Sequence, residues 1–275
     1  LGPGDGSLTK ILLRTFQQFP LFNKTVRIFL YEKSNLLANI QKKNINNSKV
    51  KWIKNFNNIK KGPVVFFGNE FFDAIPIKQF TKDKNILMEK YFSLNKENKI
   101  NEIYKKASDK DVLRIKKFRT LKNLKFIEFP KLGLDELKKM IKKISKLEGG
   151  LLLIDYGYLI AKNKNTLQSL INHKKNSLLH NLGKADITSL VNFNLLNEYF
   201  INNNLKVKKI VTQKFFLERM GIIERANKLS LKMSFREQSN LYLRLKRLLD
   251  KKLMGNLFKV IFAYKSKKDN FLGFE

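Results

Sequence analysis

The chain begins with the glycine-rich stretch Leu1-Gly2-Pro3-Gly4-Asp5-Gly6-Ser7. The pattern that follows predicts an amphipathic helix with its apolar face in the core. The apolar positions of that face are Leu8, Ile11, Leu12, Phe16 and Phe19. A glycine turn before a helix places backbone N–H groups at the positive end of the helix dipole, and it lets a ligand approach where a Cβ would collide. The stretch therefore indicates either a ligand-binding loop or a plain strand-to-helix turn.

The position of this glycine loop in the chain is unusual. A loop of this kind follows the first strand of a nucleotide-binding sheet, and Leu1 would be the last residue of that strand. We therefore expect the first strand to be missing from this sequence. The spacing G-x-G-x-G also differs from the dinucleotide fingerprint G-x-G-x-x-G, and no P-loop lysine follows it.

The composition is that of a folded protein with a strong positive charge. The 275 residues are 43% hydrophobic and 12% aromatic, which is enough for a large core. The net charge is +33, but the lysines are spread along the chain and accompany many Asn, Ile and Phe residues. We interpret this charge as a solvated lysine coat that attracts acidic partners, and we expect no specific nucleic-acid-binding face.

Several kinds of site are disfavoured by the residues present. The chain has no cysteine, so disulfides and thiolate metal sites are excluded. The two histidines, His173 and His180, are seven residues apart and match no zinc motif, so we expect no metal. The longest apolar run, at 151–154, is too short to span a bilayer, and we expect no membrane insertion.

Three apolar segments are predicted as parallel strands, each followed by polar residues. The segment 26–32 ends in Glu32, an acid placed to accept hydrogen bonds from ribose hydroxyls; an ordinary strand-end acid is the alternative. The segment 64–67 is apolar throughout, as expected for a strand buried on both faces, and the segment 151–158 begins with four apolar residues and then contains Asp155 and Tyr156. The sequence therefore predicts a crevice at the carboxyl ends of these strands.

The densest motif follows the second of these strands, at 68–76. It contains Asn69 and two acids, Glu70 and Asp73, which would project from one side if the segment turned helically. Phe71 and Phe72 lie between the acids. We expect a functional role for at least one acid; the alternative is that Asp73 caps a helix while the aromatic residues fill the core.

The rest of the chain predicts further elements of an α/β fold in one domain, 1–275. A β-rich insertion is expected at 77–133, and a substrate-side insertion at 158–205. The expected strands of the first insertion, which form a meander, are 77–80, 86–92, 100–104 and 126–128. The other expected elements are a short helix at 36–41, a strand at 50–53, helices at 134–147, 193–200, 216–220, 222–229 and 236–249, and strands at 207–211 and 257–264. The last strand is expected to be antiparallel.

Four stretches, LGPGDGSL (1–8), NEFFDAIP (69–76), IDYG (154–157) and DITSLVNF (186–193), resemble one known family in the same order. This family comprises the mitochondrial complex I assembly arginine methyltransferase and its bacterial MidA-like relatives. The resemblance implies a Rossmann-like class I fold and S-adenosyl-L-methionine (SAM) as cofactor. It also implies symmetric dimethylation of an arginine in a respiratory NADH dehydrogenase subunit. The location would be cytoplasmic in a bacterium and the mitochondrial matrix in a eukaryote.

The resemblance also implies site residues. The backbone of Gly2, Gly4 and Gly6 would hold the methionine part of SAM, and Glu32 its ribose. Three positions depart from the family: Asp5 stands where a basic residue is usual, Asn192 where Asp is usual, and Ser189 near a frequent His.

For the reaction, we expect Glu70 to orient the guanidinium nitrogen and Asp73 to support it, because carboxylates bind guanidinium bidentately. Asn69 belongs to this catalytic group. The expected substrate-binding residues are Phe71, Phe72, Asp155, Tyr156 and Asp186.

Two other function classes remain open from the sequence. The Asn69–Phe72 block distantly resembles the Asn-Pro-Pro-Tyr block of methyltransferases that act on amide and exocyclic amino groups, so an RNA or DNA amino group, or a small molecule, is an alternative substrate. The other class is a non-catalytic assembly factor that binds SAM.

Overall fold

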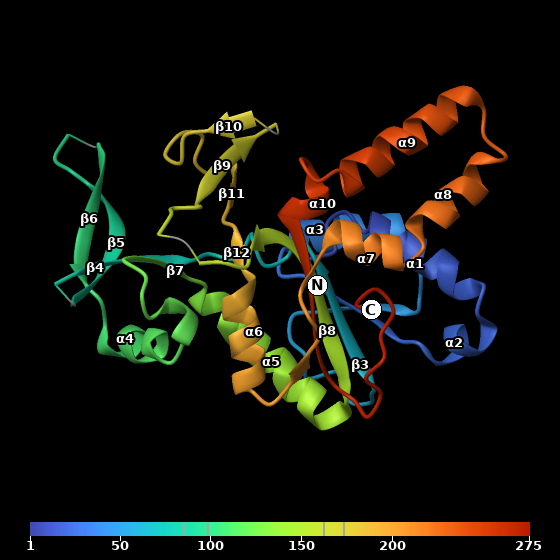
Figure 1. Ribbon diagram of the computed structural model, residues 1–275, viewed down its shortest axis with the longest axis horizontal. Coiled ribbons are helices and arrows are strands. Elements are labelled where there is room, and N and C mark those ends of the chain that lie inside the picture. The colour runs from blue at the N-terminus through green and yellow to red at the C-terminus, as the bar shows by residue number, and fades with distance from the viewer. Residues whose placement is uncertain (85, 98, 162, 173) are drawn as a thin grey trace.

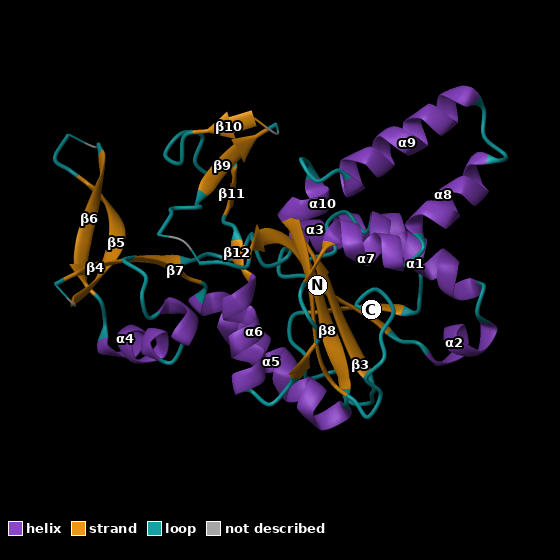
Figure 2. Cartoon of the chain, in the orientation of Figure 1, coloured by secondary structure: helices purple, strands orange, loops and turns teal. Residues whose placement is uncertain are grey.

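The computed structural model describes residues 1–84, 86–97, 99–161, 163–172 and 174–275, so His173 lies outside the described residues. Figures 1 and 2 show a central sheet with helices on both sides and two smaller β-structures away from it. The helices are α1 (Ser7–Gln17), α2 (Pro20–Thr25), α3 (Asn35–Ile45), α4 (Asp109–Lys116), η1 (Arg119–Leu121), α5 (Lys131–Leu147), α6 (Phe193–Asn202), α7 (Gln213–Arg219), α8 (Ile222–Ser230), α9 (Phe235–Leu249) and α10 (Met254–Leu257). The strands are β1 (Ile28–Tyr31), β2 (Val50–Ile53), β3 (Val64–Asn69), β4 (Lys78–Asp83), β5 (Ile86–Leu94), β6 (Ile100–Lys106), β7 (Phe126–Phe129), β8 (Gly149–Tyr158), β9 (Gln168–Ile171), β10 (Lys174–Asn176), β11 (Asp186–Thr188), β12 (Val191–Asn192), β13 (Lys206–Val207), β14 (Val211–Thr212) and β15 (Phe258–Lys265).

Strand β8 is at the centre of the main sheet. It pairs in parallel with β3 and antiparallel with β15, which confirms the predicted antiparallel last strand. Alternate side chains of β8 face two apolar clusters: Leu151 and Leu153 belong to one, and Ile154 to the other. Helices α5 and α6 pack on the first face, while α7, α10 and the C-terminal segment cover the second. Burial on both faces explains why the sequence of β8 is a continuous apolar run.

The prediction of one continuous strand at 207–211 is wrong. It is divided into β13 and β14, which pair with different parts of β15. Residues 208–210 between them lie outside both strands, although the Lys208 N–H still donates to the Phe262 carbonyl at 3.0 Å. The chain therefore keeps contact with β15 while leaving the regular ladder.

The first two residues lie between the β1–β2 pair and the main sheet. The Leu1 amino group donates to the Phe67 carbonyl of β3 at 2.8 Å. The Gly2 N–H donates to the Tyr31 carbonyl at the end of β1, at 3.1 Å. Strands β1 and β2 run parallel to each other. The spatial order is thus β2, β1, residues 1–2, β3, β8, β15 and β13, and the glycine loop leaves from the carboxyl ends of β1 and β3.

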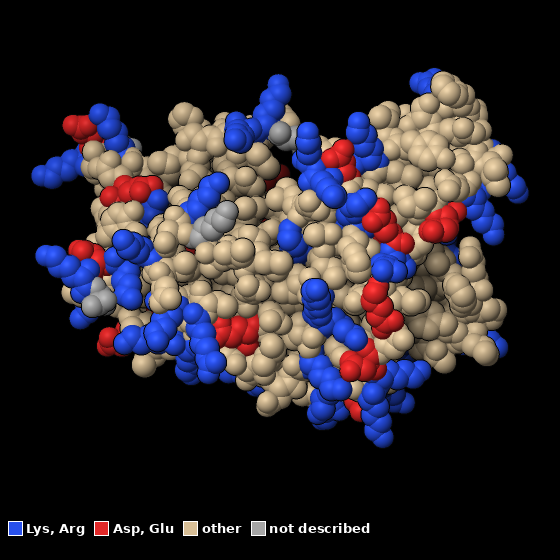
Figure 3. Space-filling view, viewed as in Figure 1, with Lys and Arg blue, Asp and Glu red and all other residues tan. Residues whose placement is uncertain are grey.

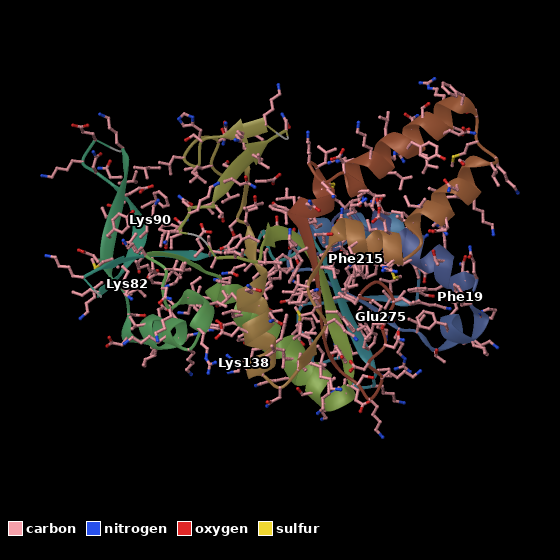
Figure 4. All side chains as sticks on the ribbon, viewed as in Figure 1. Phe19, Lys82, Lys90, Lys138, Phe215 and Glu275 are labelled. Atoms are coloured by element: carbon pink, nitrogen blue, oxygen red, sulfur yellow. The ribbon has the colours of Figure 1, made fainter. Side chains whose placement is uncertain are left out.

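Helix α1 forms as predicted, but its predicted buried face is wrong. Leu8, Ile11 and Phe19 are exposed, whereas the buried residues of the helix are Thr9 and Leu13. Figure 4 shows Phe19 near the edge of the molecule, where α1 passes into α2. Leu13 packs against β1, β2 and the end of α3, so the helix is rotated relative to the orientation that the apolar spacing favoured.

Helix α5 confirms its prediction and ends where the glycines indicated. Its buried residues recur at helical spacing and include Leu134, Leu137, Met140, Ile141 and Ile144. Gly149 then enters β8 with φ +114°, and a Cβ there would lie 1.9 Å from the Val64 carbonyl oxygen. Only glycine fits between these two strands at that point.

The predicted meander is confirmed. Strands β4, β5 and β6 are consecutive antiparallel neighbours, and β7 pairs with β4, giving the order β6-β5-β4-β7. The small sheet β10-β9-β11 lies between this meander and the helices α9 and α10 in the view of Figure 1. No helix in the described part of the chain is long and apolar enough to cross a membrane.

Lys and Arg side chains are spread over the face shown in Figure 3, with acidic side chains interspersed among them. Lys82 lies on the meander and Lys138 lies on α5, well apart in Figure 4. On this face the positive charge forms a coat rather than a single patch, as the sequence indicated.

Candidate cofactor and substrate site

The glycine loop has an open backbone surface. Gly2, Gly4 and Gly6 all have positive φ values, +52°, +57° and +88°. Gly6 is the N-cap of α1 and makes no side-chain cap bond, whereas Asp5 Oδ1 accepts the N–H of Ser7, the first helical residue, at 2.9 Å. A Cβ on Gly4 would have no heavy atom within 4 Å. The loop therefore combines a helix N-terminus, where Asp5 takes the N–H of Ser7, with open space beside Gly4, which suits a polar ligand.

Glu32 follows β1 and is tied to the glycine loop through Gln41 of α3. One Glu32 oxygen accepts the Ser34 N–H at 2.8 Å, and the other accepts from Gln41 Nε2 at 3.1 Å. Gln41 Nε2 also donates to the Gly4 carbonyl at 2.8 Å, and its Oε1 accepts from Trp52 Nε1 at 2.9 Å. Gln41 is fully buried. This amide therefore fixes the expected ribose acid relative to the loop.

Gln41 is a residue that the sequence analysis missed. The available signal is its spacing: it lies four residues before Ile45 on α3, and both are the buried residues of that helix. A glutamine on the core side of an amphipathic helix needs buried polar partners.

The segment after β3 is not helical. Glu70 and Asp73 were expected to project from one side only if it were, so this expectation is wrong. Glu70 is exposed and has φ +48°, a left-handed conformation that is uncommon for a residue with a side chain. Asp73 is only 5% exposed. Asn69 ends β3, and its Nδ2 lies 3.4 Å from Glu70 Oε1. Among the described residues, this is the one hydrogen-bonding contact of the Glu70 carboxylate.

The two aromatic residues of the motif lie in different surroundings. A Cβ on Gly2 would lie 3.1 Å from the ring of Phe71, so this ring covers the glycine loop. Phe72 is buried, and its ring lies against Gly133 of α5. The motif therefore contacts the glycine loop through Phe71 and the core through Phe72.

Asp73 and Asp155 form a buried carboxyl pair at the ends of β3 and β8. Asp155 is 1% exposed, and its Oδ2 accepts the N–H groups of Phe72 at 2.8 Å and Asp73 at 3.3 Å. Its Oδ1 accepts the Tyr156 N–H at 3.0 Å. Burial, together with the neighbouring Asp73 carboxylate, raises the pKa of Asp155 to about 8. Near neutral pH the pair therefore retains a proton.

The surroundings of Asp73 favour its protonated form. Burial raises the pKa of the Asp73 carboxyl, although the Tyr156 hydroxyl beside it opposes the rise. No hydrogen-bond partner among the described residues reaches the buried Asp73 Oδ1. The Tyr156 hydroxyl also lies near Thr188 of β11, and burial and Asp73 raise the pKa of Tyr156. Tyr156 thus lies between the carboxyl pair and the small sheet.

The segment 186–192 approaches this pair only in part. Asp186 is exposed in β11 and pairs with Leu170 of β9, and no contact of its side chain with the other candidate residues is found among the described residues. Ser189 is buried, and its N–H donates to the Asp73 carbonyl at 3.1 Å. Asn192 is the N-cap of α6 and accepts the Leu195 N–H at 3.1 Å. Asn and Asp cap helices equally well, so this departure from the family preserves the cap.

The residues present fit a nucleoside-type cofactor that carries an amino acid. The loop offers helix N-terminal N–H groups, Glu32 offers carboxylate oxygens, and Gly4 leaves space beside its backbone. Asp5 is exposed and turned to Ser7, so it does not fill that space. Among the described residues, no cluster of three acidic or histidine side chains could hold a metal ion.

Comparison with known proteins agrees with this fit. A family model described as an S-adenosyl-L-methionine-dependent methyltransferase matches residues 1–211. A mitochondrial protein arginine methyltransferase, the NDUFAF7 homolog of Caenorhabditis elegans, is 28% identical over 256 residues, covering 83% of this chain and 58% of the relative. Human mitochondrial protein arginine methyltransferase NDUFAF7 is 25% identical over 248 residues, covering 81% of this chain and 55% of the relative. The chain thus spans somewhat more than half the length of these curated relatives.

Two crystal structures of Burkholderia thailandensis proteins share the fold. One aligns with a TM-score of 0.83 and 18% identity over 99% of this chain and 74% of the other. The second, bound to S-adenosyl-homocysteine, aligns with a TM-score of 0.80 and 20% identity over 99% of this chain and 72% of the other. The cofactor is S-adenosyl-L-methionine. Because the family model matches residues 1–211, which are most of the chain, the chain belongs to the family of S-adenosyl-L-methionine-dependent methyltransferases.

Proposed function

We propose that this protein is a protein arginine N-methyltransferase. Its curated relatives, which are named protein arginine methyltransferases, support this assignment. The family resemblance further suggests symmetric dimethylation of a respiratory NADH dehydrogenase subunit, in the mitochondrial matrix of a eukaryote or the cytoplasm of a bacterium.

The observation that carries the proposal is the position of Glu70. Its carboxylate is exposed beside Phe71, whose ring lies on Gly2 of the cofactor loop. A non-glycine residue with φ +48° costs free energy and persists where the surroundings hold it, often at a functional site. An exposed carboxylate held beside a cofactor loop is suited to bind a guanidinium group through two parallel hydrogen bonds.

The chemistry requires orientation more than acid–base strength. Bound SAM supplies an electrophilic methyl group. Glu70 would hold the guanidinium by two N–H···O hydrogen bonds and direct one nitrogen toward the loop, while Asn69 Nδ2 orients the Glu70 carboxylate. Phe71 would exclude water from the space beside Gly2. The buried Asp73 would support Glu70 from within the same segment, and its carbonyl accepts the Ser189 N–H.

The test is Glu70→Gln in the whole protein, assayed with labelled SAM and an arginine-containing protein substrate. We expect kcat to fall by about 100-fold or more, since one oriented interaction in a transition state is worth that much. The Kd for SAM should change less than about threefold. The matched control is Glu148→Gln, because Glu148 is also exposed with a positive φ but lies at the end of α5. Full turnover by the Glu70 variant would refute the role of this carboxylate.

The same assay separates the other classes of function. Label recovered on RNA, DNA or a small molecule instead of a protein arginine would contradict the proposed substrate. SAM binding without transfer to any fraction of a lysate would indicate a non-catalytic assembly factor.

A further inference from the structure

The conformation of Glu70 needs an explanation in the backbone, since its side chain has one polar contact among the described residues. Two neighbouring residues of β8 provide it. The Glu70 N–H donates to the Ile154 carbonyl at 3.0 Å, which extends the β3–β8 ladder by one residue. Two residues later, the chain is held by the side chain of Asp155. Glu70 is therefore fixed on both sides by consecutive residues of one buried strand.

The contacts of Asp155 are all with the protein interior. Its carboxyl group accepts three backbone N–H groups, from Phe72, Asp73 and Tyr156, at 2.8 Å, 3.3 Å and 3.0 Å. Asp155 is 1% exposed, so no substrate atom can reach it in this conformation. A carboxyl group whose oxygens accept N–H groups from two separate segments fixes the relative position of those segments. This differs from the direct substrate contact that the sequence suggested for Asp155.

We propose that Asp155 is a positioning residue, which holds Glu70 beside the cofactor loop through the backbone N–H groups of residues 72 and 73. This inference rests on the proposed function only for the expected effect on kcat; the expected effect on the backbone does not need it. Without the hydrogen bonds from Asp155, the backbone at Phe72 and Asp73 could rotate and relieve the strained φ of Glu70, although both side chains are buried. The ring of Phe71 lies against Gly2, and the ring of Phe72 lies against Gly133. They fix the turn at its apolar side chains, while Asp155 fixes its backbone.

The first experiment needs no substrate. Amide hydrogen exchange is measured over residues 70–75 in the wild-type protein and in Asp155→Asn, which keeps the volume but replaces one accepting oxygen by an N–H₂ group. We expect exchange of the Phe72 and Asp73 amides to accelerate by about tenfold or more. The matched control is Asp111→Asn, because Asp111 is also a 1% exposed aspartate but lies in α4. Unchanged exchange at residues 72 and 73, or equal acceleration in the Asp111 variant, would overturn the proposal.

The second experiment is a double-mutant cycle with Glu70→Gln. If Asp155 acts through Glu70, Asp155→Asn lowers kcat by about tenfold or more in the wild-type background but by less than about twofold in the Glu70→Gln background. The KM for SAM should change little in both. Additive losses would mean that Asp155 acts independently of Glu70. If no arginine is methylated at all, the exchange experiment still decides whether Asp155 holds the turn, so failure of the proposed function is distinguishable from failure of this inference.

If Asp155→Asn fails to fold, Asp155→Glu takes its place in both experiments. It keeps the carboxyl group but moves the oxygens by about one methylene, so the turn should exchange faster while the core remains formed. Wild-type exchange and wild-type kcat in Asp155→Glu would contradict the proposal.

Discussion

Two buried groups of acids in this protein are neutralised in opposite ways. The strand-end pair consists of Asp73 and Asp155, and backbone N–H groups and a retained proton stabilise it. The meander cluster consists of Asp111 and Glu89, which are paired with Lys78 at 2.8 Å and 2.7 Å, and Lys131, which lies 3.2 Å from Asp111. Asp155 and Asp111 are equally buried, at 1% exposed.

The difference appears in the direction of the pKa shifts. Burial acts to raise the pKa of both aspartates, but at Asp111 the hydrogen bonds from Lys78 and Lys131 outweigh burial and the pKa falls. At Asp155 no cation compensates, and the pKa rises. Lys259 lies opposite Asp155 in the β8–β15 ladder, but its amine donates to carbonyls of Asn256 and Leu257. The cluster that joins elements of the meander and α4 is therefore ion-paired, whereas the carboxyl pair without a compensating cation among the described residues lies beside the candidate site.

The largest expected effect on stability comes from removing the shared cation of the meander cluster. Lys78→Met keeps the apolar stem but leaves two buried acids, with Lys131 as the cation that still contacts Asp111. We expect a loss of about 2–4 kcal/mol at pH 7, because breaking a buried pair leaves an uncompensated charge. Urea denaturation measures it. As the contrasting variant, Asp73→Asn removes a charge without stranding a partner and should cost less; equal losses would remove the distinction between the two groups.

The next effect is on the pH dependence of the free energy of unfolding, which has opposite sign for Asp155 and Asp111. The folded-state pKa of Asp155 is about 8, above the ordinary value near 3.9, so its contribution to stability is complete at acid pH and is lost as pH rises toward 8. We expect the wild-type protein to lose about 1–3 kcal/mol more than Asp155→Asn between pH 6 and pH 8.5, measured by urea denaturation at each pH.

Asp111 provides the control for this sign. Because its pKa is lowered, its contribution is present above the ordinary aspartate value and is lost as pH falls through the folded-state pKa. Asp111→Asn should therefore keep the alkaline decline and weaken the acid one. An alkaline decline that persists unchanged in Asp155→Asn would show that another group causes it.

The smallest expected effects come from deleting one hydroxyl beside each group. Ser108→Ala removes a donor to Asp111 at 3.1 Å and the N-cap of α4, and Tyr156→Phe removes the hydroxyl beside Asp73. Each should cost about 1 kcal/mol at pH 7 in urea denaturation. The Tyr156 variant alone should shift the alkaline decline to higher pH, because its hydroxyl opposes the raised pKa of Asp73. A shift in Ser108→Ala instead would contradict the separation of the two groups.

Much of the fold was predictable because the apolar residues recur at the spacing of buried strands and of amphipathic helices. The buried strands β3 and β8 and the strands of the meander follow from local patterns, whereas the antiparallel direction of β15 was expected from the order of elements in a methyltransferase sheet. Helix α1 shows where such reasoning fails: its sequence has enough apolar residues to define two faces, and packing of Leu13 against β1 and β2 selected the less obvious one. The division into β13 and β14 depends on the path of β15, which no local pattern contains.

The sequence by itself determined the family, the glycine loop and the order of polar strand ends, because these depend on residue types at short spacing. It also placed Glu70, Asp73 and Asp155 near one edge of a sheet. Tertiary structure alone decided that Glu70 is exposed in a strained conformation, that Asp155 is buried beneath it, and that Gln41 joins Glu32 to the loop. Burial and hydrogen-bond partners depend on which distant segments meet, and the chemistry of a carboxyl group follows from those contacts.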